Sequence, residues 1–168
     1  GVSGWLSMAT IVAVNRWADV CQQIGDTDIG ERLRTRSARI ALSVQQHLWT
    51  GEWYARGITD DGRRFGVPEE QEGRIYLNAQ SWALLADLPD KDQQNALLSA
   101  IDEHLLTPFG PMLLAPPYTR MVEDIGRLTQ KHPGYAENGS IYNHAVMFLV
   151  HALYRCRDAE RAYSLLQR

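Results

Sequence analysis

The feature that most constrains the fold is a succession of helical stretches that alternate in character. Residues 3–24 carry apolar side chains nearly all round the helix, so we expect this helix to be buried on most sides. Residues 28–48 carry one apolar stripe and a polar face with four arginines, which we interpret as a solvated outer face. Further helices are expected over 78–88, from Asp90 to about residue 106, from 138–139 to about residue 155, and after Asp158.

Two stretches between these helices break the helical pattern. Residues 49–66 contain Asp60, Asp61 and Gly62 between two short runs with strand character, which predicts a small hairpin. Residues 107–138 hold five of the seven prolines and are expected to form a long loop. Loops of this length inside a compact domain are usually functional or disordered.

Helices that come in consecutive pairs, one apolar and one amphipathic, are typical of an α/α toroid. In such a fold an outer ring of helices buries the inner ring, and long connections gather at one end. No parallel βαβ pattern is present. The sequence therefore predicts an all-α fold that forms part of an α/α toroid, with long loops and a small hairpin.

Composition excludes several classes of function. The net charge of −3 gives no electrostatic basis for binding nucleic acid or an anionic membrane. No stretch is both long and apolar enough to span a bilayer, and no secretory signal opens the chain, so we expect a cytoplasmic protein. Cys21 and Cys156 lack the spacing of a metal site, and we interpret them as two buried thiols in a reducing compartment.

Polar and aromatic side chains gather where two of the loops lead into helices. Residues 71–82 (QEGRIYLNAQSW) and residues 133–144 (PGYAENGSIYNH) combine amides, carboxylates and aromatic rings, and the second segment ends on an imidazole. Unpaired N–H groups at a helix N-terminus attract anions. Sugars bind planar rings through their faces and amide or carboxylate groups through their hydroxyls. From the residues alone, these segments predict a polar and carbohydrate-binding end of a helical fold.

Each of these residues also has a purely structural interpretation. Asn78 and Asn138 have the character of helix caps, and Trp82 that of a core residue. Glu137 fits a first-turn acid that interacts only with the helix dipole. His144 lies seven residues before His151 on the same helix face, a spacing that favours packed histidines over a metal pair.

Three ordered blocks of the chain resemble glycoside hydrolase family 94, the cellobiose and chitobiose phosphorylases and their relatives. Residues 73–82 (GRIYLNAQSW) resemble the family's G-K/R-I-F/Y-L-N-x-Q-S-W block. Residues 117–129 carry PYT and then DIGRLT, which resemble the next block. Residues 133–145 (PGYAENGSIYNHA) resemble P-G-x-x-E-N-G-G-I-F-x-H-A, and residues 4–6 (GWL) resemble an earlier G-E-S-V-W-L segment. Several ordered blocks are more specific than any single motif.

The resemblance implies a fold and a reaction. The fold would be an (α/α)6 barrel preceded by a β-sandwich domain. The reaction would be phosphorolysis of a β-linked disaccharide or oligosaccharide with inversion, which gives an α-sugar 1-phosphate. Inorganic phosphate is then a co-substrate, and neither a cofactor nor a metal is implied. By the same resemblance His144 would bind phosphate, whereas the sugar would be bound by Glu137, Asn138, Gln80 and Tyr118.

The catalytic group of that family is not among these residues. The resemblance places the general acid, an aspartate of a D-W-N-D-like block, upstream of Gly1. We therefore expect residues 1–168 to be a fragment of the catalytic barrel domain, without the β-sandwich and the acid, and inactive by itself. A non-catalytic helical carbohydrate-binding module and an α/α-toroid glycoside hydrolase remain alternatives. The acceptor (glucose, gluconate, N-acetylglucosamine or a β-glucan) and a homodimeric state of the full-length protein are left open.

Overall fold

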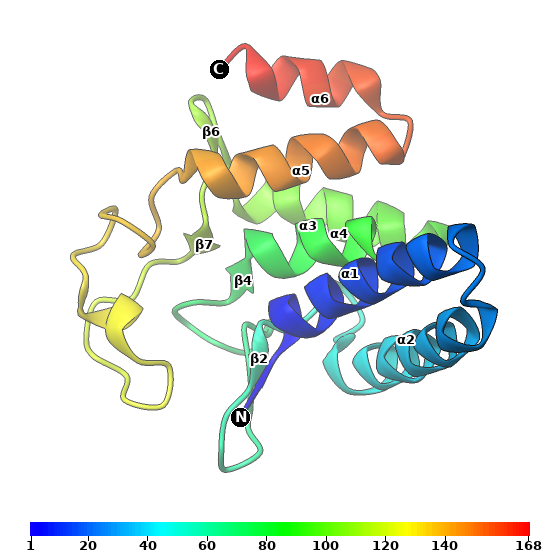
Figure 1. The fold of residues 1–168 in the computed structure, drawn as a ribbon. Coiled ribbons are helices and arrows are strands. Elements are labelled where there is room, and N and C mark those ends of the chain that lie inside the picture. Colours follow the sequence, from blue (N-terminus) through cyan, green and yellow to red (C-terminus); the bar gives the residue numbers. More distant parts are fainter.

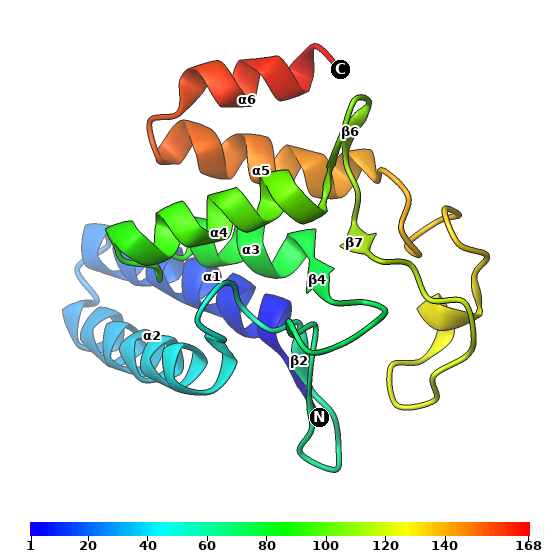
Figure 2. The same ribbon diagram turned by 180° about the vertical axis from the view of Figure 1, so that it is seen from behind.

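A computed structural model describes all residues from Gly1 to Arg168, and it is mainly helical. Six helices follow one another in three consecutive pairs, and the second helix of each pair runs back alongside the first (Figures 1 and 2). The helices are α1 (Gly4–Gln23), α2 (Thr27–Leu48), α3 (Leu77–Leu85), α4 (Lys91–His104), α5 (Asn143–Arg155) and α6 (Ala159–Leu166). None of the six has the combined length and apolar character that crossing a bilayer requires.

Helices α1, α3 and α5 lie side by side and begin at the same end of the molecule (Figures 1 and 2). Helix α1 packs against α2 and α3, while α3 also contacts α4 and α5, and α5 contacts α6. Gly30 permits the close approach of α2, because a Cβ atom there would lie 3.3 Å from the carbonyl oxygen of Ala18. The arrangement is three helical hairpins whose first helices are parallel. It confirms a mainly helical fold, and its place in an α/α toroid stays a prediction.

The short strands gather at the end where these parallel helices begin. Strands β1 (Val2–Ser3), β2 (Gly57–Ile58) and β3 (Arg64–Phe65) form an antiparallel sheet whose β2–β3 hairpin turns at the predicted residues 60–62. Strand β4 (Ile75–Tyr76) pairs with β7 (Leu114–Ala115), and β5 (Leu106–Thr107) pairs with β6 (Gly110–Pro111). A 3-10 helix, η1 (Arg127–Gln130), interrupts the long loop.

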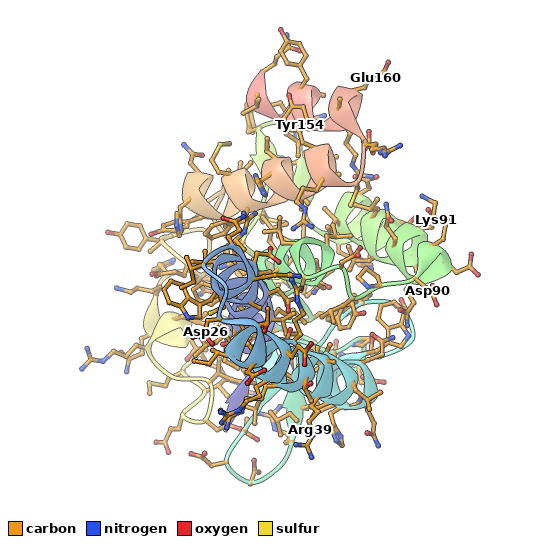
Figure 3. The ribbon with its side chains drawn as sticks, turned by 45° about the vertical axis from the view of Figure 1, so that its right-hand side comes forward. Asp26, Arg39, Asp90, Lys91, Tyr154 and Glu160 are labelled. Atoms are coloured by element: carbon orange, nitrogen blue, oxygen red, sulfur yellow. The ribbon has the colours of Figure 1, made fainter.

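The core is one cluster of 28 buried residues to which all six helices contribute, and α3 lies at its centre. Every residue of α3 is buried except Asn78 and Trp82. Around it pack the largest fully buried side chains, among them Trp53, Tyr54, Leu97, Ile101 and Leu149. Helix α4 begins where the sequence predicts, because Asp90 accepts a bond from the Gln93 amide at 2.9 Å while the Gln93 side chain accepts one from the Asp90 amide. Asp90 and Lys91 lie together at the start of this helix (Figure 3).

Several details differ from the sequence-based predictions. The fifth helix begins at Asn143 and not at 138–139, because Asn138 is buried in the preceding loop. Tyr76, not Asn78, is the N-cap of α3. Helix α1 is not buried on most sides, since Leu6, Trp17 and Val20 are 62%, 58% and 38% exposed. Cys21 is buried as expected, but Cys156 is only half-buried, and this burial raises the pKa of its thiol.

The arginine-rich face of α2 is solvated as predicted. Arg32, Arg34, Arg36 and Arg39 are all exposed, and Figure 3 shows Arg39 on the outside of the helix. Arg34 contacts Asp19 of α1 at 2.6 Å, a pair in which both side chains are about half exposed. Such exposed pairs contribute little to stability.

Candidate functional site

A cavity of about 340 Å³ opens at the end where α1 and α3 begin, and the sequence blocks converge on it. Its apolar lining comes from Trp5, Tyr76 and three leucines, Leu113, Leu114 and Leu128. The polar side chains that line it come from the hairpin, from the start of α3 and from the long loop: Arg56, Asn78, Arg127, Lys131 and Glu137. Side chains from four separate parts of the sequence therefore line one cavity.

Three cations and one carboxylate line this cavity. Arg56 extends from the segment before β2, and its guanidinium lies 5.7 Å from the ring centroid of Trp5 and 5.9 Å from that of Tyr76. Its only side-chain hydrogen bond donates to the Ser3 hydroxyl at 2.9 Å, and it makes no ion pair. Burial lowers the pKa of Arg56, but a guanidinium remains charged at any physiological pH. Together with Arg127 and Lys131, it gives the cavity a positive excess.

Two buried polar atoms of lining residues have no partner within the protein. They are Nε1 of Trp5, a donor, and Oδ1 of Asn78, an acceptor. Buried polar atoms are normally hydrogen-bonded, so each unpaired atom requires an explanation. A ligand hydroxyl can satisfy either atom, because it can accept a hydrogen bond from the indole N–H and donate one to the amide oxygen.

Glu137 lies at the cavity on an exposed turn that precedes α5 by several residues. Ala136 before it adopts a positive φ of 50°, and the carbonyl oxygen of Glu137 accepts a bond from Gly139 at 3.2 Å. The structure thus places Glu137 in the loop and not in the first turn of a helix. Its carboxylate makes no hydrogen bond or ion pair with the protein, which leaves both oxygens available to a ligand.

Two predicted sugar-binding residues, Gln80 and Asn138, are fully buried and have their amides engaged by the backbone. Gln80 accepts from the Tyr54 amide at 3.0 Å and donates to the carbonyl oxygens of Tyr54 and Tyr76. Asn138 accepts from the Tyr118 amide at 2.8 Å and donates to the carbonyl oxygens of Tyr118 and Lys131. Contact with sugar stays a prediction for both, while their present bonds fix the backbone around the cavity.

The third, Tyr118, lies behind the cavity wall. Its hydroxyl is 2.7 Å from that of Tyr76, and both rings are buried. Burial raises the pKa of Tyr118 to about 12, and burial likewise raises the pKa of Tyr76. Tyr76 lines the cavity, whereas Tyr118 contacts it only through its bond to Tyr76. Sugar binding by Tyr118 therefore stays a prediction.

His144, the predicted phosphate ligand, does not line this cavity. It is the second residue of α5, it is exposed, and its ring lies 4.6 Å from Phe148 and 6.2 Å from Tyr142 in edge-on contacts. Phosphate binding by His144 therefore stays a prediction. No group of three or more potential metal ligands comes together in the structure, and the expectation that no metal is used remains a prediction as well.

Sequence reasoning missed five of the lining residues as ligand candidates: Trp5, Arg56, Asn78, Arg127 and Lys131. Arg127 and Lys131 lie four residues apart in the long loop, a spacing that could have drawn attention to them. Nothing in the sequence around Arg56 marks it, because its stacking on Trp5 and Tyr76 joins three segments that are distant along the chain.

Comparison with known proteins adds a second line of information. The family model described as "Glycosyl hydrolase 94 superfamily, catalytic domain" matches residues 1–168. The chain is 48% identical to a cellobionic acid phosphorylase of Neurospora crassa over 99% of its own length and 21% of that protein. It is 41% identical to a 3-O-β-D-glucopyranosyl-β-D-glucuronide phosphorylase of Paenibacillus borealis, over 88% of the chain and 19% of that protein.

A more distant relative is an N,N'-diacetylchitobiose phosphorylase of Vibrio proteolyticus. Identity to it is 32%, over 86% of the chain and 18% of that protein. The chain thus spans about a fifth of the length of the curated relatives it matches. All three relatives are named as phosphorylases of glycosides.

Proposed function

The chain belongs to the glycosyl hydrolase 94 superfamily, and from this premise we propose that it forms part of an inverting glycoside phosphorylase. Phosphate attacks the anomeric carbon of a β-linked disaccharide from the face opposite the glycosidic oxygen. The bond to that oxygen breaks, and an aspartic acid outside residues 1–168 protonates it. The products are an α-sugar 1-phosphate and the free acceptor sugar, and no general base is needed because phosphate itself is the nucleophile.

The observation that carries this proposal is the free carboxylate of Glu137 at the cavity. It accompanies an unpaired donor on Trp5 and an unpaired acceptor on Asn78. These groups can hold the hydroxyls of one sugar ring, and a carboxylate that accepts hydrogen bonds from two hydroxyls binds more tightly as the ring gains positive charge in the transition state. Gln80, Asn138 and Tyr118 support this arrangement by fixing the segments that carry the lining residues.

His144 is proposed as a phosphate ligand from its place at the start of α5. An exposed imidazole near a helix N-terminus can donate to an anion that the helix end also attracts. We further propose a cytoplasmic location, in keeping with a reaction that consumes inorganic phosphate.

The charge of the cavity favours an acidic acceptor. The cavity is lined by three cationic side chains, Arg56, Arg127 and Lys131, and by one carboxylate, that of Glu137. A neutral disaccharide carries no negative charge that would complement this positive excess. Cellobionic acid and a glucuronide, which the first two relatives are named for, both carry a carboxylate. Among the acceptors that the sequence leaves open, we therefore propose a sugar acid such as gluconate.

The test is synthesis by the full-length protein. α-Glucose 1-phosphate is offered with gluconate, glucuronate, glucose or N-acetylglucosamine, and phosphate release is measured. We expect release with a sugar acid and much less with neutral sugars. Equal rates with glucose would overturn the acidic acceptor, and no release with any acceptor would overturn the phosphorylase. Hydrolysis of disaccharides without phosphate would favour the glycoside hydrolase alternative, and binding without turnover the non-catalytic module.

A further inference from the structure

One wall of the cavity comes from a loop that has no regular secondary structure except η1. Residues 117–139 carry Arg127, Lys131 and Glu137 to the cavity. Within the loop, the Thr129 hydroxyl accepts from the Val122 amide at 2.9 Å and donates to the carbonyl oxygen of Gly126 at 2.8 Å. These bonds close the loop on itself, but they do not fix its position relative to the opposite wall.

A single guanidinium joins this loop to the hairpin. Arg63 contacts the Asp124 carboxylate at 2.5 Å through Nη2 and the Glu70 carboxylate at 2.6 Å through Nη1. The other oxygen of Glu70 accepts from the Gly66 amide at 3.0 Å. Proximity to Asp124 raises the pKa of Arg63. Because Glu70 is hydrogen-bonded to the backbone just after β3, Arg63 links Asp124 to the hairpin.

The same hairpin carries the opposite wall of the cavity. The Arg56 amide donates to the carbonyl oxygen of Phe65 at 2.8 Å, and the Thr59 amide donates to that of Arg63 at 2.9 Å. Arg63 therefore lies in a hairpin that is hydrogen-bonded directly to Arg56. Through Asp124, it is also connected to the loop segment that holds Arg127 and Lys131.

We propose that Arg63 is a positioning residue for the acceptor side of the cavity. By holding Asp124, it sets the spacing between Arg56 on the hairpin and the Arg127 and Lys131 cations on the loop. This inference rests on the proposed function, because it takes that spacing as the one an acidic acceptor requires. Thr119 also donates to Glu72 at 2.5 Å, and the Tyr118 hydroxyl is 2.7 Å from that of Tyr76 in β4, so the loop stays attached when the Arg63–Asp124 pair is broken.

The ion pair is exposed enough to respond to salt. The side chains of Arg63 and Asp124 are 43% and 41% exposed. Partly exposed ion pairs are screened by electrolyte and are individually modest in energy. Loss of this pair should therefore weaken acceptor binding by a small factor and should do so mainly at low ionic strength.

The test compares two carboxylate-to-amide variants in the full-length protein. Asp124→Asn removes the loop partner of Arg63 and leaves Glu70 in place. Asp19→Asn is the matched control, since it removes the partner of Arg34 in an exposed pair away from the cavity. Gluconate is the probe, and its KM in synthesis from α-glucose 1-phosphate is measured together with its Kd by calorimetry.

For Asp124→Asn, we expect KM and Kd for gluconate to rise about 2- to 5-fold at low salt, with kcat and the KM for α-glucose 1-phosphate unchanged. The ratio of the gluconate KM in Asp124→Asn to that in the unmodified protein should fall toward one as the salt concentration is raised, and the ratio of the Kd values should do the same. Asp19→Asn should match the unmodified protein throughout. An unchanged gluconate KM and Kd in Asp124→Asn, or an equal rise in Asp19→Asn, would overturn the positioning role.

Calorimetry separates the two proposals. If the unmodified protein binds gluconate but releases no phosphate, the phosphorylase assignment fails. The gluconate Kd of Asp124→Asn, compared with that of the unmodified protein, then still decides the role of Arg63. If the unmodified protein does not bind gluconate, the acidic acceptor fails, and the inference about Arg63 fails with it.

Discussion

At the scale of single residues, a substitution of Glu137 distinguishes a ligand-binding role from a purely structural role most clearly. Its carboxylate lines the cavity without any protein partner, so Glu137→Gln should leave the melting temperature nearly unchanged. Turnover should fall about 10- to 100-fold in both directions, since a charge-assisted hydrogen bond contributes roughly 1.5–3 kcal/mol. Initial rates and melting curves of the full-length protein check this. Glu103→Gln, on the exposed face of α4, is the control. Unchanged turnover with a lower melting temperature would show that Glu137 serves only the fold.

A second prediction concerns His144 and the binding of phosphate, the proposed nucleophile. His144→Ala should raise the KM for phosphate about 10- to 100-fold and leave the KM for the disaccharide nearly unchanged, because an imidazole hydrogen bond to a charged group contributes roughly 1.5–3 kcal/mol. Phosphorolysis measured at varied phosphate checks this, with His151→Ala, also exposed on α5, as the control. If only sugar binding weakened, the assignment of His144 to phosphate would be wrong.

Gly73 supports the Tyr76–Tyr118 hydroxyl pair. It adopts a φ of 60°, and a Cβ atom there would lie 1.9 Å from the Tyr118 hydroxyl. Gly73→Ala should lower the free energy of unfolding by about 2–5 kcal/mol, from backbone strain of roughly 1–2 kcal/mol plus about 1–3 kcal/mol of overpacking. Gly62→Ala shares the positive φ but meets nothing within 4 Å, so it isolates the backbone contribution. Equal losses in the two variants would refute a clash with Tyr118.

At the scale of secondary-structure elements, the cap of α4 allows a direct stability test. Asp90→Ala removes the acceptor of the Gln93 amide, and loss of such a cap costs about 0.5–2 kcal/mol. Chemical denaturation should show this loss. Asp92→Ala, in the first turn without a capping bond, should lose less. A larger loss for Asp92→Ala would show that the capping bond is not what stabilises this end.

The helices could be predicted from sequence because their signals are local. Asp90 and Asp158 cap helices within three residues of their own position, and the apolar stripes repeat at helical spacing. The start of α5 could not be predicted in this way. Asn138 has the local character of a cap, but its amide bonds to Tyr118 and Lys131 instead. The cavity could not be predicted for the same reason. Arg56 lies over the ring of Trp5, which is 51 residues earlier in the sequence, and Lys131 lines the same cavity only because of the fold of the long loop.

At the scale of the whole molecule, we propose that residues 1–168 hold only part of the catalytic site. The family resemblance places the general acid outside this chain, and a positioned acid is worth about 10²- to 10⁴-fold in rate. We therefore predict that the isolated 168-residue chain forms no sugar 1-phosphate under conditions in which the full-length protein does. Folding of the isolated chain is checked by circular dichroism in the same experiment. Measurable product from the isolated chain would contradict this.

The buried amides of Gln80 and Asn138 have a consequence for evolution. Each makes three bonds to the backbone, so replacing either one leaves several peptide groups unpaired inside the protein. Selection for stable folding alone is then enough to retain Gln80 and Asn138, even in a homologue that has lost catalytic activity. The free carboxylate of Glu137 has no such protection and would drift as soon as catalysis ceased to matter. Among homologous genomes, the state of Glu137 should therefore mark which lineages remain enzymes, whereas Gln80 and Asn138 should persist in both.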